Sequence, residues 1–404
     1  MKKTSIKPCV VGLGYVGLPL FLKLQKKIDT IGYDNNKFRI TELIEKKDRN
    51  NEFSKKNLIL EKKSIFTYNK SFLKNCNFFI IAVPTPVLKN NKPDLTFLKK
   101  SCETIGKYLN KDDIVFFEST VYPGITENFC GKILQKESGL KLDAEFFIGY
   151  SPERINPGDK KHAIDKIIKI VSANKEYALK IGKSVYQKVS KKIIINKNIK
   201  EAESAKVIEN IQRDLNIGLM NEIYKVCLNS KINFSNVIKL SSTKWNFLKF
   251  NPGLVGGHCL PVDPYYYSYF AKVYGISTEI LLAGRRVNNS MFKFIFKKIK
   301  NDLYNKNLKL KKSKILMLGL SYKKNVSDLR NSYAIKLAEL IKKNSLKLDV
   351  YDPLISSVKV KKLNLINKLK LNKYDIIINA VNHDVFRDKI KMIKKKKLNY
   401  IELF

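Results

Sequence analysis

The chain has 404 residues, more than one hydrophobic core usually accommodates, so two or three domains are expected. With 44% hydrophobic and 11% aromatic residues, its composition is that of a globular protein with a large core. The formal net charge of +42 suggests a nucleic-acid or membrane-surface partner. However, the lysines are spread along the whole chain, and no recognition-helix, zinc-finger or aromatic RNA-binding pattern accompanies them. We therefore favour general lysine enrichment over nucleic-acid binding, and expect the charge to concentrate anionic ligands such as nucleotides.

The cysteines and histidines indicate neither a disulfide framework nor a metal site. Six cysteines are scattered without CxxC pairs, as in a reducing cytosol, and the three histidines are far apart in the sequence. No stretch approaches the roughly 18 apolar residues of a membrane span, and the apolar run 9–22 lacks a signal-peptide cleavage site. A cytoplasmic protein without a membrane partner or a bound metal is expected.

The first predicted elements are a strand over 6–11, a turn over 12–17, a helix over 18–27 and a strand over 30–33. The turn has the sequence GLGYVG, and a GxGxxG between a strand and a helix, with an acidic residue about 20 positions on, is typical of dinucleotide binding. Glycines let the backbone reach a pyrophosphate at the helix N-terminus. The carboxylate of Asp34 can bind a ribose diol and would repel the 2′-phosphate of NADP. Pro8 fits a central strand only near its start.

Three further predicted strands each end in polar residues. They cover residues 78–83, 114–118 and 146–150, and they are followed by Thr85, by Ser119-Thr120 and by Glu153-Arg154. In a doubly wound sheet, ligands bind beyond the carboxyl ends of the strands, so these polar residues are candidates for a site. Each could also be a turn or a helix cap.

A long helix without proline is predicted over residues 201–230. Lys206, Asn210 and Arg213 recur at i, i+4 and i+7 and therefore share one face. Such a row is more often a solvated stripe, but the adjoining positions are apolar, so we expect the helix to be buried on more than one side. A buried Lys–Asn–Arg row needs an anionic or polar partner.

The stretch FNPGLVGGHCLPVDPYYY, residues 250–267, is predicted to be a loop, because glycine and proline interrupt it at both ends. Its glycines allow the backbone to approach a ligand closely, and Cys259 and Asp263 supply a thiol and a carboxylate four residues apart. The alternative is a surface turn with a buried cysteine, which is often only a small hydrophobic residue.

A second α/β pattern follows this stretch. Its predicted elements are a helix over 278–304, a lysine-rich linker over 305–313, strands over 314–320, 348–351, 375–381 and 400–404, a helix over 334–343, and a solvated lysine turn over 394–397.

Taken together, the motifs resemble those of the nucleotide-sugar 6-dehydrogenases, the UDP-glucose/GDP-mannose dehydrogenase family, over nearly the full length of the chain. The matching motifs are, in family order, GLGYVGLPL, VPTP, ESTVYPG, SPERINPGD, EAESAKVIENIQRDLN, FNPGLVGGHCLPVDP and SDLRNS. Within the family, SPERINPGD and NIQRDLN are most similar to the enzymes of Vi-antigen type. Those enzymes act on UDP-N-acetylglucosamine or UDP-N-acetylgalactosamine and feed uronic-acid surface polysaccharides.

The resemblance implies an α/β fold with two Rossmann-like doubly wound domains joined by a long central helix. The implied domains are an NAD-binding domain over 1–199, a central helical dimerisation and active-site domain over 200–305, and a C-terminal UDP-binding domain over 306–404. The implied reaction of the homodimer oxidises the C6 alcohol of a UDP-sugar to a carboxylate with two NAD⁺. A hydride leaves the alcohol, a thiolate adds to the aldehyde, a second hydride leaves, and water cleaves the thioester.

The resemblance also assigns site residues. The catalytic assignments are Cys259 as a thiolate nucleophile activated by nearby positive charge, Lys206 and Asn210 as stabilisers of oxygen charge at C6, and Asp263, Thr120 and Glu153 as groups that handle protons and water. The cofactor-binding assignments are Gly12, Gly14, Tyr15, Val16, Gly17, Asp34, Arg39, Thr85, Thr120 and Arg330. The substrate-binding assignments are Arg154, Lys206, Asn210, Arg213, Phe250, Gly256 and Lys323. The remaining cysteines match no motif and are expected to pack in the interior: Cys9, Cys76, Cys102, Cys130 and Cys227.

Arg154 and Arg213 are expected to select the sugar. UDP-glucose enzymes of the family typically have apolar residues at these positions, whereas an acetamido carbonyl or a phosphate rewards a guanidinium donor. Val262 stands where some relatives have a lysine, so the cofactor contact of that lysine is not carried over. The C4 epimer stays open, and UDP-glucose and UDP-N-acetylmannosamine are alternative substrates.

Two other functions fit parts of the sequence. A two-electron hydroxyacid dehydrogenase shares the N-terminal fold, but it has no need of Cys259 or of a nucleotide-binding C-terminal domain. A nucleic-acid-binding protein would use the positive charge, and its binding should weaken steeply with salt.

Overall fold

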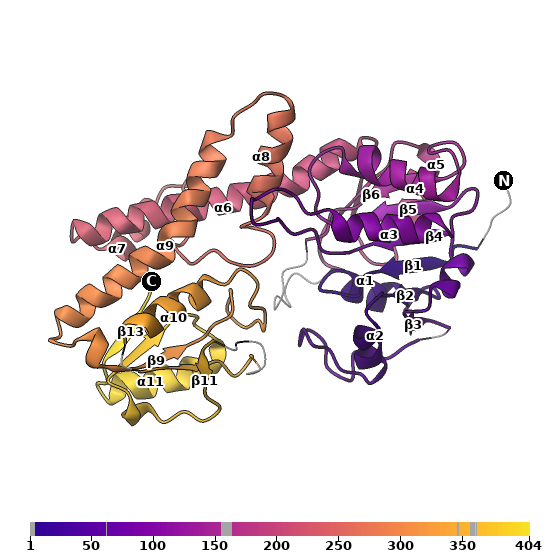
Figure 1. The fold of residues 1–404 in the computed structure, drawn as a ribbon. Helices are drawn as coiled ribbons and strands as arrows, with labels where there is room; N and C mark the ends of the chain where they lie inside the picture. The colour runs from indigo at the N-terminus through magenta and orange to yellow at the C-terminus, as the bar shows by residue number, and fades with distance from the viewer. Residues whose placement is uncertain (1–4, 62, 155–163, 346, 356–359, 361) are drawn as a thin grey trace. The chain divides into compact units, whose positions relative to one another are not determined.

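The computed structural model describes residues 5–61, 63–154, 164–345, 347–355, 360 and 362–404, so the second half of the SPERINPGD motif lies outside the described residues. The chain divides into two compact units. The first comprises the chain up to Glu209 together with Tyr265–Ile276, and the second comprises Asn210–Pro264 and Ser277–Phe404. Helix α6 (Ile199–Asn229) is one continuous helix that contributes residues to both units (Figure 1). The predicted three-domain boundaries stay a prediction beside this division.

The first unit is built on an eight-stranded sheet with the order β3-β2-β1-β4-β5-β6-β7-β8. Its strands are β1 (Pro8–Val11), β2 (Ile31–Tyr33), β3 (Ile65–Thr67), β4 (Phe78–Ile81), β5 (Ile114–Phe117), β6 (Phe147–Tyr150), β7 (Lys169–Ser172) and β8 (Ile193–Asn196). Neighbouring strands are parallel except β6 and β7, which pair antiparallel. The order of β3 to β6 is that of dinucleotide-binding folds, which confirms the predicted Rossmann-like sheet. β1 begins at Pro8, as expected for a proline in a central strand.

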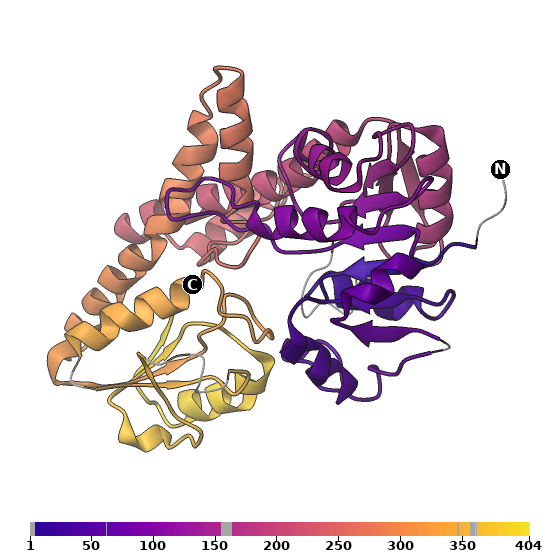
Figure 2. The ribbon, with the colours of Figure 1, turned by 45° about the vertical axis from the view of Figure 1, so that its right-hand side comes forward.

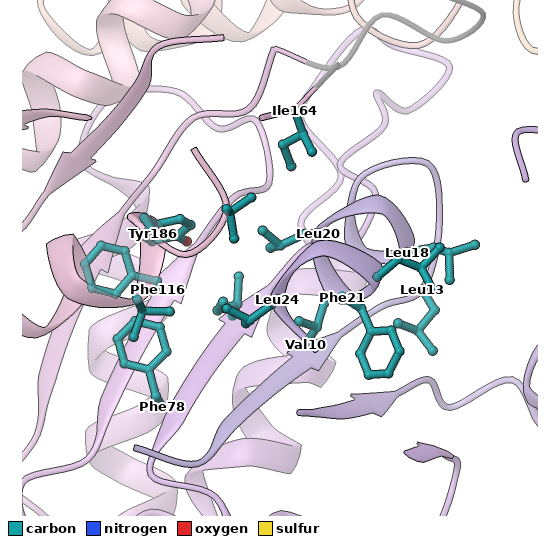
Figure 3. Packing of buried hydrophobic residues seen from close by; sticks show 14 of the residues in the cluster. Val10, Leu13, Leu18, Leu20, Phe21, Leu24, Phe78, Phe116, Ile164 and Tyr186 are labelled. Atoms are coloured by element: carbon teal, nitrogen blue, oxygen red, sulfur yellow. The ribbon is translucent and has the colours of Figure 1, made fainter. Parts of the chain in front are cut away.

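Helices cover both faces of this sheet, because successive residues of a strand point to opposite sides. The helices of the first unit include α1 (Gly17–Leu24), α2 (Lys37–Ile44), α3 (Thr96–Gly106), α4 (Lys132–Ser138) and α5 (Glu176–Tyr186), with a 3₁₀ segment η1 (Lys70–Asn75) and a π-helical segment η2 (Thr126–Gly131). Val10, Phe78 and Phe116 pack with the buried residues of α1 and α5 (Figure 3). On the other face, Phe79 and Phe117 pack with α3 and α4.

The second unit is built on a five-stranded parallel sheet with the order β11-β10-β9-β12-β13. Its strands are β9 (Lys314–Leu318), β10 (Lys347–Tyr351), β11 (Asn364–Leu365), β12 (Ile376–Asn379) and β13 (Tyr400–Glu402). Its helices include α7 (Phe234–Ser241), α9 (Glu279–Tyr304), α10 (Tyr333–Asn344) and α11 (Arg387–Lys395), with 3₁₀ segments η3 (Leu310–Lys312), η5 (Leu371–Lys373) and η6 (Asp384–Phe386).

α10 and α11 lie on opposite faces of the five-stranded sheet (Figure 2). Ile315 of β9 packs in the cluster that contains Leu337 of α10, whereas its neighbour Leu316 packs in the cluster that contains Ile393 of α11. The alternation of strand side chains therefore separates two cores. One mostly parallel and one parallel sheet, each covered by helices, confirm the predicted α/β class.

Two predictions of local structure are wrong in part. The stretch 250–267 is not a loop over its whole length. It is irregular up to a short turn that ends at Val262, and α8 (Asp263–Val273) begins directly after that turn. Asp263 and Pro264 occupy the first turn of α8, where a carboxylate is favourable and a proline is tolerated. Lys394 and Lys395 belong to the end of α11 rather than to a turn, while Lys397 has a φ of +51° and does lie in one.

Candidate active site

The glycine-rich turn after β1 is held by hydrogen bonds to the end of β2. Gly12, with a φ of +90° in the region that favours glycine, donates its N–H to the carbonyl of Tyr33 at 2.8 Å. The N–H of Leu13 donates to Oδ2 of Asp34 at 2.9 Å, and that of Asn36 donates to Oδ1 at 2.9 Å. Asp34 nevertheless stays partly exposed. Its carboxylate is therefore oriented by the backbone and accessible to a polar ligand.

The glycines of this turn have different surroundings. A Cβ on Gly17 would lie 1.8 Å from the carbonyl oxygen of Gly12, so close packing of α1 on the turn requires glycine there. Gly14 is exposed, and a Cβ on it would meet nothing within 4 Å. Tyr15 and Val16 are partly exposed beside it. An open backbone at the start of α1 fits the pyrophosphate of a dinucleotide.

Arg39, predicted to bind the cofactor, is buried beneath this turn, with 4% of its surface exposed. Its Nε donates to the carbonyl of Leu13 at 2.9 Å, and its Nη1 forms an ion pair with Asp48 at 2.9 Å. The guanidinium thus supports the turn from within the first unit, and a direct contact with the cofactor stays a prediction.

Side chains tie together the ends of β4 and β5. The Thr85 hydroxyl donates to the carbonyl of Thr120 at 2.6 Å, and the Ser119 hydroxyl donates to the carbonyl of Val83 at 2.7 Å. Thr85 is buried and Thr120 is partly exposed. The two predicted threonines are therefore brought together at one edge of the sheet.

The segment after β6 is docked on the first part of α6. Lys206 is 4% exposed and donates from Nζ to the backbone carbonyl of Glu153, and the same nitrogen lies 3.4 Å from Oε1 of Glu153. One turn further along α6, Glu209 forms an ion pair with Nε of Arg154. The buried lysine of the predicted row thus has the anionic partner that burial requires.

A buried ion pair behind this segment was not predicted. Nζ of Lys169, at the start of β7, lies 2.7 Å from Oε2 of Glu118, and both side chains are shielded from solvent. Burial raises the pKa of Glu118, and the nearby Lys169 opposes that shift. Lys169 also donates to the carbonyl of Pro152 at 3.5 Å. The acidic first residue of ESTVYPG, at the end of an apolar strand, was the signal that could have drawn attention to Glu118.

Glu203 is a second buried acid that the sequence did not single out. It precedes Lys206 by three residues on α6 and accepts N–H groups from Gly124 at 2.5 Å and from Thr126 at 2.9 Å. Burial raises the pKa of Glu203 to about 7, although these hydrogen bonds oppose the shift. The side chain anchors the loop that follows Thr120.

In the second unit, Asn210 orients the acid at the start of α8. Its Nδ2 donates to Oδ2 of Asp263 at 2.6 Å, and its Oδ1 accepts from Nη2 of Arg213 at 3.3 Å. Asn210 and Asp263 are each 1% exposed. The predicted Asn–Arg pair of α6 is thus linked to a predicted catalytic carboxylate.

Cys259 lies in the turn that leads into α8. Its carbonyl accepts the N–H groups of Val262 and Asp263, each at 2.9 Å. All six cysteines are described and none forms a disulfide; five are buried, as predicted, and Cys259 alone is partly exposed. Burial raises the pKa of Cys9 and of Cys130 well above the ordinary value, so those two thiols stay protonated at neutral pH.

The residue next to Cys259 does not supply the positive charge expected there. Burial and the nearby Arg330 lower the pKa of His258 to about 4, so its imidazole is neutral at pH 7. Arg330 is the cation close to His258 within the second unit, and it forms an ion pair with Asp328 at 2.6 Å. The source of the positive charge expected at Cys259 therefore stays a prediction.

The glycines before Cys259 are required by packing. A Cβ on Gly256 would lie 2.7 Å from the carbonyl oxygen of Asn331, and one on Gly257 would lie 2.7 Å from the ring of Tyr322. These contacts explain the glycines without a ligand, so the substrate contact at Gly256 stays a prediction. Phe250 and Lys323, the other predicted substrate residues of this unit, are partly exposed.

The described residues contain neither a metal-binding cluster nor a membrane-spanning helix. No group of three or more His, Cys, Asp or Glu side chains in this part of the chain could hold a metal ion. Likewise, none of its helices combines the length and the apolar character needed to span a bilayer.

The chain matches known proteins over nearly its full length. Residues 6–190 match the NAD-binding domain of the UDP-glucose/GDP-mannose dehydrogenase family, residues 200–290 its central domain and residues 316–401 its UDP-binding domain. Protein CapL of Staphylococcus aureus is 44% identical over 95% of this chain and 92% of its own length. The UDP-N-acetyl-D-glucosamine 6-dehydrogenase of Salmonella typhi is 42% identical over 95% and 91%.

Among solved structures, the UDP-D-ManNAc dehydrogenase of Pyrococcus horikoshii superimposes with a TM-score of 0.87 at 29% identity, covering 98% of this chain and 95% of that one. The site residues described above lie in the three segments that match the family's domains. The chain belongs to the UDP-glucose/GDP-mannose dehydrogenase family of NAD-dependent nucleotide-sugar 6-dehydrogenases.

Proposed function

We propose that this chain oxidises the C6 alcohol of a UDP-N-acetylhexosamine to the carboxylate in two successive steps, with Cys259 as a covalent nucleophile. The observation that carries the proposal is a partly exposed thiol four residues before Asp263, whose carboxylate is held by Asn210. The second hydride must leave an adduct of the aldehyde, and a thiol can form that adduct and later release the acyl group.

NAD⁺ supplies the hydride acceptor for both oxidations. The open backbone at Gly14 and the accessible carboxylate of Asp34 fit its pyrophosphate and its ribose diol. The overall balance converts one alcohol, two NAD⁺ and one water into one carboxylate, two NADH and three protons.

The side chains divide the work by chemistry. As the alcohol loses a proton and a hydride, Lys206 and Asn210 stabilise negative charge on the C6 oxygen. The Cys259 thiolate then adds to the aldehyde, and loss of the second hydride leaves a thioester. Water attacks the thioester carbonyl and the thiol is released. Thr120, Glu153 and Asp263 orient this water, and the two carboxylates take up the protons released by the alcohol and by the water and pass them to solvent.

The proposal is tested by the number of NADH molecules formed per sugar. The wild-type chain should form two, and Cys259→Ser should form no carboxylate at an appreciable rate, because a protonated serine hydroxyl is a far weaker nucleophile than a thiolate. Cys227→Ser, which alters a buried cysteine of the same unit, is the matched control and should still yield two. One NADH per sugar from the wild type would indicate a two-electron dehydrogenase. Full conversion to acid by Cys259→Ser at the native rate would refute the nucleophile.

The choice of a C2-acetamido sugar is supported by the 42% identity to the Salmonella typhi relative and by the two arginines. Other proteins similar to this chain are named for UDP-N-acetyl-D-mannosamine, and the family is named for UDP-glucose, so both sugars are alternatives. Replacing Arg154 and Arg213 together by alanine should lower the preference for UDP-N-acetylhexosamine over UDP-glucose about tenfold, the effect of one lost charge-assisted hydrogen bond. The measurement is kcat/KM on a panel of UDP-sugars, and an unchanged preference would refute the selecting role.

A homodimer through α6 is part of the same proposal. Ile208, Leu219 and Val226 are 48%, 53% and 61% exposed, and their spacing of eleven and seven residues places them on one face of the helix. Sedimentation should give a dimer, and Leu219→Glu with Val226→Glu should give a monomer. A wild-type monomer at micromolar concentration would contradict this part. We also propose that the enzyme works in the cytoplasm and that its uronic-acid product feeds surface polysaccharide synthesis.

A further inference from the structure

A buried polar face runs along α6 beyond the residues already discussed. Glu203, Lys206, Asn210, Asp214 and Asn221 are all at most 4% exposed. At about 3.6 residues per turn, positions four and eleven residues after 210 return to nearly the same side of a helix. Asp214 and Asn221 therefore continue the row that carries Lys206 and Asn210, although the proposed chemistry uses neither.

Asn221 is bonded to both backbone groups of one loop residue. Its Oδ1 accepts the N–H of Gly253 at 2.8 Å, and its Nδ2 donates to the carbonyl of Gly253 at 3.0 Å. Gly253 lies in irregular backbone that belongs to no strand or helix. A partly buried backbone outside regular secondary structure needs partners for its polar groups, and here a side chain of α6 supplies them.

The orientation of the Asn221 amide is set by its other neighbours. Nδ2 of Asn288 donates to the carbonyl of Asp214 at 2.9 Å and to Oδ1 of Asp214 at 2.9 Å, so Oδ1 of Asn288 is left as an acceptor. Nδ2 of Asn221 donates to that Oδ1 at 2.8 Å. Arg285 holds Oδ1 of Asp214 at 2.6 Å, and both of these side chains are fully shielded. A flipped Asn221 amide would place two acceptors against each other and two donors against each other.

We propose that Asn221 is a positioning residue for the loop that carries Cys259. The loop has three anchors in the second unit. Asn221 holds Gly253, Asn331 and the carbonyl of Arg330 hold Gly257 at 2.9 Å and 3.1 Å, and Asn210 holds Asp263. Without the first anchor, the segment from Phe250 to Gly256 loses the two hydrogen bonds that fix the backbone of Gly253, and the packing of Leu254 on the core remains.

The loop that Asn221 anchors carries the proposed nucleophile and two predicted substrate contacts. Phe250 and Gly256 are predicted to contact the substrate, and Cys259 lies two residues beyond the second anchor. The inference therefore rests on the proposed function. A more mobile loop would place the Cys259 thiol less often within bonding distance of the C6 aldehyde. Small misplacements of a nucleophile lower the reaction rate strongly.

The test uses Asn221→Asp, which keeps size and shape but exchanges the donor nitrogen for a carboxylate oxygen that faces the Gly253 carbonyl and Oδ1 of Asn288. We expect kcat/KM for the UDP-sugar to fall about tenfold or more, with a higher KM for the sugar. Alkylation of Cys259 by iodoacetamide, followed by mass spectrometry of its peptide, should become severalfold faster, because the thiol is less confined. NADH affinity should change less than about twofold, since the dinucleotide-binding turn lies in the first unit.

Asn216→Asp is the matched control, because Nδ2 of Asn216 donates to the carbonyl of Gln212 on the same helix. It should leave the alkylation rate and kcat/KM at wild-type values. If Asn221→Asp does not fold, Asn221→Ser removes the paired hydrogen bonds without adding a charge, and the same readouts apply. A folded Asn221 variant with wild-type alkylation rate and sugar KM would overturn the inference, whereas NADH stoichiometry and Cys259→Ser test the proposed function separately.

Discussion

β1 and β9 each lead into a glycine in the left-handed region, Gly12 with a φ of +90° and Gly319 with a φ of +85°. In the second unit, the N–H of Gly319 donates to the carbonyl of Tyr351 at 3.0 Å, and the N–H of Leu320 donates to Oδ2 of Asp352 at 2.8 Å. These are the same bonds that join the first turn to the end of β2. The two sheets therefore share one backbone frame. It consists of a strand, the glycine that follows it, and an acidic residue directly after the neighbouring strand.

The acid of the frame is used differently in the two units. Asp34 is partly exposed, whereas Asp352 is 3% exposed and lies 3.4 Å from Nε2 of His383. Nδ1 of His383 accepts the N–H of Asn325 at 2.8 Å, which assigns the ring hydrogen to Nε2, on the side of Asp352. Burial raises the pKa of Asp352, but the hydrogen bonds from His383 and the backbone outweigh it and leave the pKa below the ordinary value.

The helix that follows the glycine also differs. α1 begins at Gly17, five residues after Gly12, whereas α10 begins at Tyr333, fourteen residues after Gly319. Only the first turn therefore leads directly into a helix N-terminus, the arrangement that binds a pyrophosphate. In the second unit, the added segment carries Lys323 and Arg330. The same backbone frame thus leaves the acid accessible in the first unit and shields it in the second.

The largest expected effect on stability and NADH binding comes from a substitution at the contact between the first glycine turn and α1. Gly17→Ala places a Cβ 1.8 Å from the carbonyl oxygen of Gly12, so α1 must move. Overpacking against backbone should cost about 3 kcal/mol or more of unfolding free energy and abolish NADH binding. Gly14→Ala is the control, because its Cβ meets nothing: it should fold normally, yet bind NADH more weakly. Denaturant unfolding and NADH fluorescence measure the two, and a normally stable Gly17→Ala would contradict the packing account.

The next largest effect distinguishes Asp352 from Asp34 by its contribution to the free energy of unfolding. Asp352→Asn replaces a buried charged acceptor of backbone N–H groups and of His383, so it should lower the unfolding free energy by about 2–3 kcal/mol. NADH affinity should be unchanged. Thermal unfolding and NADH titration check both parts, and a loss of NADH affinity would break the comparison.

Asp34→Asn should lower NADH affinity and leave the stability nearly unchanged, the reverse of Asp352→Asn. Its carboxylate is partly exposed, so the unfolding free energy should change by less than about 1 kcal/mol. NADH should bind roughly tenfold more weakly, because a charge-assisted hydrogen bond to the ribose diol becomes a neutral one. The same titration decides the matter: equal NADH affinity in Asp34→Asn and the wild type would remove the ligand role.

The smallest effect at neutral pH is a difference in acid response. Burial and Arg330 lower the pKa of His258 to about 4, so the stability that its neutral form contributes is present above pH 6.5 and is lost as the pH falls towards 4. Glu203, in the first unit, has the opposite sign. Its pKa, raised to about 7 by burial, makes its stability contribution complete below about pH 4.5 and lost as the pH rises through 7.

Urea unfolding of His258→Gln and Glu203→Gln at pH 5 and pH 7.5 measures both slopes. His258→Gln should lose less stability than the wild type on going to pH 5, and Glu203→Gln should lose more. At pH 7.5 the His258 variant should match the wild type within about 1 kcal/mol, apart from packing changes. Parallel pH slopes in the wild type and both variants would contradict these assignments.

Local patterns in the sequence predicted much of the frame. The glycines of GLGYVG, the strand that starts at Pro8 and the acid at Asp34 were all recognised, because each depends on backbone conformation within a few residues. The polar ends of β4, β5 and β6 were also predicted, since parallel strands end at one edge of a sheet. The start of α8 at Asp263 was missed because the glycines and prolines around it outweighed its capping position.

The supporting residues could not be predicted, because their partners are distant in the sequence. Glu118 binds Lys169 across 51 positions, Glu203 binds Gly124 across 79, and Asn221 binds Gly253 across 32. α6 shows why periodicity did not reveal them. Its buried residues are partly polar and partly apolar, and its exposed residues include Ile208 and Val226, so it lacks the single apolar stripe of an ordinary surface helix.

The amino-acid order alone was sufficient for the α/β class, the dinucleotide turn and the thiol–carboxylate spacing, since turn geometry and hydrophobic period are properties of short segments. Folding decided which acids stay available and which are used inside the protein. Asp34 and Asp352 both follow a strand that ends in tyrosine, yet His383 shields only the second. Burial and long-range hydrogen bonds set the charge and accessibility of a side chain, and no short segment contains that information.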